Sequence, residues 1–394
     1  MYSVSLEIVE IKLSALIVYN NQLTFKEDKP MSAVAIQPYA LLDDDECEQR
    51  ILAAKEKLGD RLVILGHHYQ RDEVFQHSDF TGDSLKLSRA AAESKAEYIV
   101  FCGVHFMAEV ADILSRPEQI SIIPDLAAGC SMADMANLAK VEKAWAELSS
   151  VIDPDESVTP VTYINSAADL KGFCGRHGGI VCTSTNARNV LEWSFGQREK
   201  ILFFPDQHLG RNTAATMGLS MDEMVVWDYD KDMGGLTVEQ IKKAKMILWK
   251  GFCSVHQMFT PEQIDDFKQK YPETKIISHP ESSYEVCQKS DYVGSTEYII
   301  NTIRDAEPNT RWLVATELNL VNRLKDQFAA EGKNVHFMSP TVCMCSTMFR
   351  IDPQHLAWTL ENLVDGNVVN QITVPADVAK NAKLALERML EVSP

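Results

Sequence analysis

Three cysteines and several polar side chains follow apolar runs of the chain, and their types suit metal binding and proton transfer. Cys130 comes after the apolar run 120–123, and Cys253 and Cys345 also follow apolar runs. Cys130 is expected at the point where a buried strand ends and a helix begins. Unpaired backbone N–H groups and the helix dipole favour a thiolate there, the form that binds metal or attacks carbon.

Three cysteines from separate parts of the chain favour a cubane iron–sulfur cluster over zinc. Structural zinc usually takes two ligands from a short C-x₂₋₄-C knuckle, and electron-transfer ferredoxins carry a C-x₂-C-x₂-C run; the chain has neither. A cluster held by three thiolates leaves one iron open, and an open metal site acts as a Lewis acid. Cys102 and Cys182 lie inside apolar runs and are expected to be core residues.

Polar pairs spaced two residues apart end three of the expected strands. Residues i and i+2 of a strand share a face, so His67 would lie beside Tyr69 and Tyr163 beside Asn165. The same spacing joins His279 to the carboxylate of residue 281. An imidazole and a carboxylate on one face form a candidate pair for proton transfer, because the imidazole titrates near neutral pH.

Hydroxyl side chains stand just after strands or at helix starts: Ser84, Ser184, Ser295 and Thr296. Hydroxyls combined with helix N-terminal amides can bind a carboxylate or a phosphate. Taken singly, each hydroxyl is more often a helix N-cap. These residues are therefore candidate substrate contacts.

Strand and helix patterns alternate along most of the chain, which predicts an α/β fold. The alternation runs through three rounds, so we predict three α/β/α units with short parallel sheets, related by a pseudo-threefold axis around a central, cluster-containing cavity. Ligands bind beyond the carboxyl ends of parallel strands, which would place the site there. The expected divisions are a poorly ordered N-terminal extension (1–40) and units 41–150, 151–260 and 261–394, the last including C-terminal helices.

The totals exclude several classes of protein. A chain of 394 residues allows two or three domains at ~150 residues each. The net charge of −18 opposes binding to nucleic acid or an anionic membrane. Nine scattered cysteines, with no secretory signal, favour metal or reactive thiols over disulfides and predict a cytoplasmic protein.

The motifs, taken together, resemble the quinolinate synthase family, enzymes of bacterial and plastid NAD biosynthesis. The resemblance runs in order across residues 60–365. Its pieces are GHHYQRDE (66–73), GDSLKLS (82–88), FMAE (106–109), PDLAAGCSMADM (124–135), TYINS (162–166), CTSTNA (182–187), WKGFCSVH (249–256), SHPES (278–282), GST (294–296) and CSTM (345–348).

The resemblance implies condensation of iminosuccinate with dihydroxyacetone phosphate to quinolinate, phosphate and water, with a [4Fe–4S] cluster as cofactor. It implies cluster ligands at Cys130, Cys253 and Cys345. Cys343 is a rival for the third, but Cys-x-x-Met at 345–348 matches the family pattern. Substrate contacts fall on His67, Ser84, Tyr163, Asn165, Ser184, His279, Glu281, Ser295 and Thr296, and catalytic roles on Tyr69, Tyr163, His279 and Glu281.

Partners and rival functions complete the expectations. The partners are the two small substrates and the enzyme that supplies iminosuccinate, with no nucleic acid or membrane. One rival is an iron–sulfur hydro-lyase acting on another dicarboxylate. The other is a non-catalytic iron–sulfur sensor, which the polar residues at the strand ends disfavour.

Overall fold

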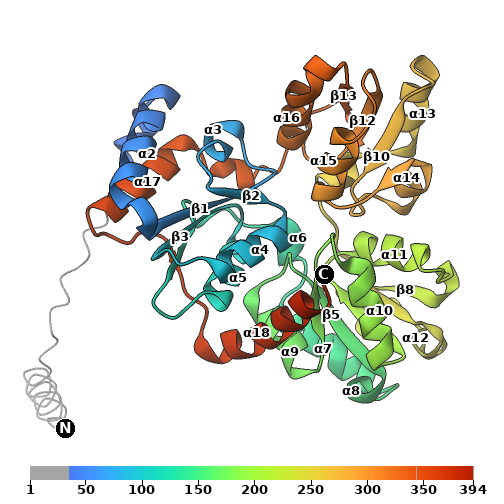
Figure 1. Ribbon diagram of the computed structural model, residues 1–394. Coiled ribbons are helices and arrows are strands. Elements are labelled where there is room, and N and C mark those ends of the chain that lie inside the picture. The colour runs from blue at the N-terminus through green and yellow to red at the C-terminus, as the bar shows by residue number, and fades with distance from the viewer. Residues whose placement is uncertain (1–34, 343, 394) are drawn as a thin grey trace, which may run out of the picture. The chain divides into compact units, whose positions relative to one another are not determined.

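The computed structural model describes residues 35–342 and 344–393, and the chain divides into two units, 1–38 and 39–394. Most of the expected extension 1–40, and the rival ligand Cys343, lie outside the described residues. The second unit has the predicted α/β fold, with three short, mostly parallel sheets flanked by helices (Figure 1).

The first sheet has the strand order β14-β4-β3-β1-β2. Its strands are β1 (Leu62–His67), β2 (Phe80–Gly82), β3 (Tyr98–Cys102), β4 (Ile120–Ile122) and β14 (Gln371–Ile372). All neighbours are parallel except β14 and β4. β1 and β3 are fully buried apolar runs, as expected for strands covered on both faces.

The second sheet is entirely parallel and has the order β6-β5-β7-β9-β8. Its strands are β5 (Val158–Tyr163), β6 (Ile180–Cys182), β7 (Lys200–Phe204), β8 (Met224–Trp227) and β9 (Met246–Trp249). Cys182 in β6, like Cys102 in β3, is completely buried, which confirms both as core residues.

The third sheet is also parallel, with the order β11-β10-β12-β13. Its strands are β10 (Lys275–Ser278), β11 (Tyr292–Val293), β12 (Arg311–Ala315) and β13 (Asn334–Phe337). Alternate residues of β12 enter different cores: Trp312 and Val314 join one cluster, while Leu313 and Ala315 join another. This two-residue period shows that helices cover both faces of the sheet.

Four helices that follow strands are capped by the side chain of the residue just before the helix. Asp83, Asp206, Ser295 and Glu317 each accept backbone N–H groups of the helix that follows. The helices are α2 (Asp44–Leu58), α3 (Asp72–Phe75), α4 (Ser84–Glu93), α5 (His105–Leu114), α6 (Ser131–Asp134), α7 (Leu138–Ser149), α8 (Pro154–Ser157), α9 (Ala168–Arg176), α10 (Ala187–Gln197), α11 (Gln207–Thr216), α12 (Val238–Lys243), α13 (Pro261–Lys270), α14 (Tyr284–Lys289), α15 (Thr296–Arg304) and α16 (Leu318–Phe328). Two short 3₁₀ turns, η5 (His256–Met258) and η7 (Met348–Arg350), follow cysteines.

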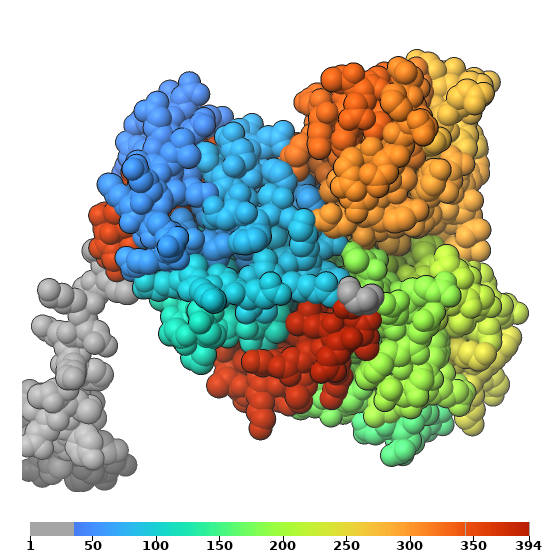
Figure 2. Space-filling view, in the orientation of Figure 1, coloured from blue at the N-terminus to red at the C-terminus, as the bar shows by residue number. Residues whose placement is uncertain are grey.

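The two C-terminal helices, which the sequence analysis assigned to the unit 261–394, pack on elements that belong with the first two sheets. Helix α17 (Pro353–Val364) packs on α2, and α18 (Ala376–Glu391) packs on α9, β6 and α5. Figure 2 shows this last segment against the parts of the chain that form the first two sheets. Buried residues of both helices belong to the core cluster that the first two sheets share.

Some short elements escaped the sequence prediction. The passage 207–245 shows no clear periodic pattern in the sequence, but it holds α11, the edge strand β8 and α12. Among the described residues, no helix combines the length and the apolar character that crossing a membrane requires.

Candidate active site

A cavity of about 70 Å³ lies where strands of all three sheets end, as expected for parallel sheets. Its wall includes every residue that the sequence selected as a ligand, substrate contact or catalytic group, except Ser295. These are His67, Tyr69, Ser84, Cys130, Tyr163, Asn165, Ser184, Cys253, His279, Glu281, Thr296 and Cys345. Residues far apart in the chain therefore meet in one place.

The three cysteines share one local structure. Each precedes a helical turn, and backbone N–H groups two or three residues later act to lower the pKa of each thiol. These N–H groups belong to Met132 and Ala133 for Cys130, His256 for Cys253, and Thr347 and Met348 for Cys345. Such N–H groups hold a sulfur in place and help to tune any metal group that it binds.

The thiols themselves favour the protonated form in the absence of a cation. Burial raises the pKa of Cys130 to about 12, and the charges of Cys345 and Glu281 act in the same direction. The expectation that the turn after Cys130 would favour a thiolate is therefore wrong for the side chain taken with the protein alone, because burial raises its pKa by more than the backbone N–H groups lower it. A bound cation would reverse the balance. Three unpaired thiols on three loops fit a thiolate-held metal group.

Two histidines of the cavity have the same hydrogen-bond arrangement. Nδ1 of His67 accepts the N–H of Tyr69 at 3.1 Å, and Nδ1 of His279 accepts the N–H of Glu281 at 3.4 Å. Burial lowers the pKa of each imidazole to about 3, so both rings are neutral. The remaining proton is then on Nε2, and each ring can donate one hydrogen bond.

Glu281 is the buried acidic centre of the site. Its Oε1 accepts the hydroxyl of Tyr163 at 2.5 Å, and its Oε2 lies 2.9 Å from Nδ1 of His256. Burial opposes its charge, but His279, His256 and Tyr163 together lower its pKa below the ordinary value. Burial, and then Glu281, raise the pKa of Tyr163 well above its ordinary value. The pair is therefore a carboxylate and a neutral phenol.

Tyr69 is held by the third sheet although it belongs to the first. Its hydroxyl lies 2.7 Å from Oγ1 of Thr316 and 3.4 Å from Oγ1 of Thr296. The guanidinium of Arg323 donates to the carbonyls of His68 and Gln70 at 3.0 and 2.7 Å. The loop that carries His67 and Tyr69 is thus fastened to α16.

The smaller polar groups differ in their surroundings. Oδ1 of Asn165 is buried without a hydrogen-bond partner in the described part of the chain, so it is available to a donor on a ligand. Ser84 and Ser184 line the cavity, as does Thr296. Ser295 caps α15 through its hydroxyl and lines a neighbouring pocket instead.

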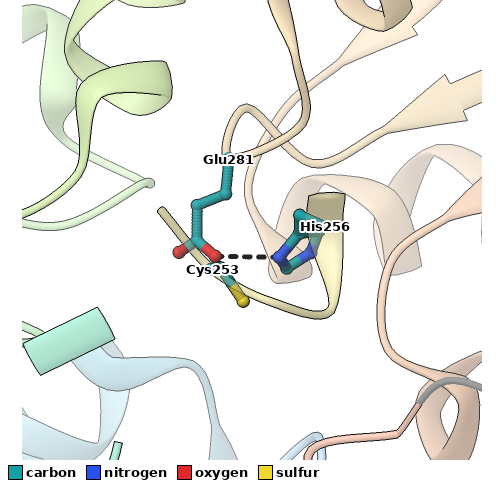
Figure 3. Close-up of side chains that lie close together, drawn as sticks. All are labelled: Cys253, His256 and Glu281. Carbon is teal, nitrogen blue, oxygen red and sulfur yellow. Dashed lines mark ion pairs between the residues drawn. The ribbon is translucent and has the colours of Figure 1, made fainter. Parts of the chain in front are cut away.

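Sequence reasoning missed His256 and Arg323. His256 is fully buried, stacks on His279 with 4.7 Å between ring centroids, and lies within 4.8 Å of ligand atoms of Cys253 and Glu281 (Figure 3). A signal existed, because His256 follows Cys253 by three residues, the spacing of one helical turn. Nothing local marks Arg323, whose partners are far away in the sequence.

The fold and the cavity together define an α/β protein whose candidate active site combines three cysteines with a His–Glu–Tyr group. The chain belongs to the family described as quinolinate synthetase A protein, whose model matches residues 49–391. It is 56% identical to a quinolinate synthase of Rhodopirellula baltica over 383 residues, covering 94% of this chain and 97% of the relative.

Two further relatives carry the same name. The quinolinate synthase of Nocardioides sp. is 58% identical over 355 residues, covering 88% of this chain and 89% of the relative. That of Acidobacterium capsulatum is 54% identical over 360 residues, covering 91% of this chain and 96% of the relative. The resemblance noted from the motifs is therefore confirmed over nearly the whole chain.

Proposed function

We propose that this enzyme condenses iminosuccinate with dihydroxyacetone phosphate to give quinolinate, phosphate and water, as a step of NAD biosynthesis. The observation that carries the proposal is the meeting of three thiols, two neutral histidines and an ionised glutamate in one cavity. Family membership supports the same reaction. We also propose a cytoplasmic location and a partner enzyme that supplies iminosuccinate.

Cys130, Cys253 and Cys345 would hold a [4Fe–4S] cluster through three thiolates. When bound, the cluster supplies an open iron that acts as a Lewis acid. The backbone N–H groups that already contact the sulfurs would stay in place around it. Cys345 is the third ligand in this assignment, because its thiol reaches the cavity.

Binding of the two substrates would use neutral donors and hydroxyls more than charged groups. His67 and His279 each offer an Nε2–H to a carboxylate or phosphate oxygen. Ser84, Ser184 and Thr296 would add hydroxyls from the wall of the cavity. The free Oδ1 of Asn165 would accept a hydrogen from an imine or hydroxyl. An anionic substrate would then accept hydrogen bonds from neutral imidazole and hydroxyl groups and would not form an ion pair with a charged side chain.

Glu281 would act as the base. Removing a proton from the carbon beside the imine of iminosuccinate creates the enamine that attacks the carbonyl carbon of the phosphate ester. The hydroxyl of Tyr163 donates a hydrogen bond to Glu281. Because its pKa is raised, Tyr163 would not stay ionised, so it would give up its proton only as it takes a second proton from another group. Tyr69 would relay protons through its contact with Thr316, and His279 would orient Glu281.

Anaerobic purification, a visible spectrum and a quinolinate assay test the proposal. We expect a brown protein that forms quinolinate from the two substrates. Cys130→Ala, Cys253→Ala and Cys345→Ala should each lose the chromophore, while Cys343→Ala and the buried control Cys102→Ala should keep it.

Other outcomes would contradict the proposal in different ways. A brown protein that only dehydrates another dicarboxylate would support the hydro-lyase alternative. A brown protein without any turnover would support a sensor. A colourless Cys343→Ala protein would overturn the assignment of Cys345.

A further inference from the structure

We infer that Cys253, His256 and Glu281 form a second metal site, one that binds a single Zn²⁺ ion when the three-cysteine group is not in place. Their ligand atoms all lie within 4.8 Å of one another (Figure 3). Cys253 and Glu281 line the cavity, and His256 is fully buried next to them. Thiolate sulfur, imidazole nitrogen and carboxylate oxygen are the three ligand types that zinc accepts.

The state of His256 is the independent sign of a ligand. The ring is completely buried, yet its Nδ1 has no hydrogen-bond partner among the described residues. An acceptor, Oε2 of Glu281, lies 2.9 Å from Nδ1 in an ion-pair contact. A buried nitrogen in this state loses free energy unless a further group binds it. A cation between Nδ1 and Oε2 would supply that group.

Hydroxyl groups already orient two of the ligands from behind. Nε2 of His256 lies 3.3 Å from Oγ1 of Thr316, which leaves Nδ1 for the metal. Oε1 of Glu281 accepts the hydroxyl of Tyr163, which leaves Oε2. Outer hydrogen bonds of this kind fix the ring orientation and strengthen metal ligands.

Geometry and charge both suit zinc. Bond lengths of zinc to sulfur, nitrogen and oxygen place tetrahedral ligands roughly 3.3–3.7 Å apart, so side-chain shifts of about 1 Å would close the site. A thiolate, a neutral imidazole and a carboxylate balance the two positive charges of the ion, which favours a buried site. The fourth position would face the cavity.

Cys253 cannot serve this ion and a cluster at the same time. Zinc binds such ligands more tightly than ferrous iron does. Zinc bound here would therefore hinder cluster loading, a consequence that rests on the proposed function. The cation site itself does not depend on that function.

The test uses the full chain, freed of metal, with Co²⁺ as a spectroscopic probe and Zn²⁺ as its competitor. We expect one Co²⁺ per chain, with a thiolate charge-transfer band that Zn²⁺ removes. Loss of a metal ligand should weaken Co²⁺ binding at least about tenfold, because loss of the groups that only orient metal ligands already costs that much. We expect this result for each of the variants His256→Ala, His256→Gln and Glu281→Gln. Cys130→Ala and Cys345→Ala are the matched controls and should bind within about twofold of the parent, since neither changes a ligand of the site.

X-ray absorption of the zinc-loaded parent protein gives a test that needs no variant. We expect one sulfur ligand per zinc, whereas three sulfurs, or loss of binding in Cys130→Ala, would overturn the inference. Iron and sulfide uptake by zinc-loaded and zinc-free protein measures the competition. If zinc binds as described but no cluster forms without zinc, the proposed function fails and the zinc site stands.

Discussion

Replacing Gly251 with alanine should displace Cys253 and weaken the fold. A Cβ atom at Gly251 would lie 2.1 Å from the carbonyl oxygen of Pro205, and real Cβ atoms essentially never come closer than 3.0 Å to such an atom. The backbone must therefore move by about 0.9 Å. The move would also break the hydrogen bond of 3.0 Å from the N–H of Gln207 to the carbonyl of Gly251.

The expected cost is about 1–3 kcal/mol of unfolding free energy, the usual range for overpacking against groups that cannot yield. Chemical unfolding of the metal-free chain measures that cost, and iron and sulfide content after anaerobic reconstitution measures the displacement of Cys253. Gly129→Ala is the matched control, because Gly129 directly precedes Cys130 but a Cβ there would meet nothing within 4 Å. A Gly251→Ala protein that unfolds and reconstitutes like Gly129→Ala would refute the reasoning.

Three other predictions concern single residues. Glu281→Gln should lower quinolinate formation about 10²–10⁴-fold, the usual contribution of a general base. Glu285→Gln is the control, because Glu285 is exposed on α14, and it should form quinolinate at the parent rate. Equal rates for the two variants would remove Glu281 from the mechanism. Arg323→Lys should lose the paired contacts to the carbonyls of His68 and Gln70. It should lower kcat/KM by up to about 10²-fold, the loss that a displacement of about 1 Å in an active site can cause. The exposed control Arg304→Lys should match the parent. Burial raises the pKa of Cys102 to about 12, so the unfolded state loses its thiol proton first, and stability falls as pH rises above the unfolded value of about 8.5. Cys102→Ala should reduce the slope of unfolding free energy between pH 9 and 11 by up to about 1.4 kcal/mol per pH unit, and an unchanged slope would contradict the burial argument.

Buried apolar runs made the sheets predictable. The strands around Ile64, Val100 and Phe203 are continuous apolar segments with turn residues after them, and such segments reveal parallel strands without any tertiary information. The polar residues after these strands were predictable for the same reason, because the carboxyl ends of parallel strands meet at one edge. Short edge strands such as β2, β8 and β14 have too few residues to show a pattern.

The missed features depend on contacts between distant residues. His256 matters because Glu281 and Thr316 come to it from the third sheet, and Arg323 matters because it reaches the loop after β1. The thiol of Cys130 was misjudged because local N–H groups can be inferred from a turn, whereas the depth of burial cannot. Helix α18 shows the same limit, since its amphipathic pattern does not say which sheet it covers.

The packing of α17 and α18 on the first two sheets has a consequence for the order of events during synthesis. Leu386 and Met389 of α18 join a core that also contains the strands of the second sheet, such as Ile180 and Val181 of β6, which are made about two hundred residues earlier. The ribosome adds residues one at a time, and domains usually fold as their segments emerge. Here the second sheet stays partly uncovered while the third is still being made. Its final packing, and with it a firm setting for Cys253, must wait until the chain past residue 389 has left the ribosome.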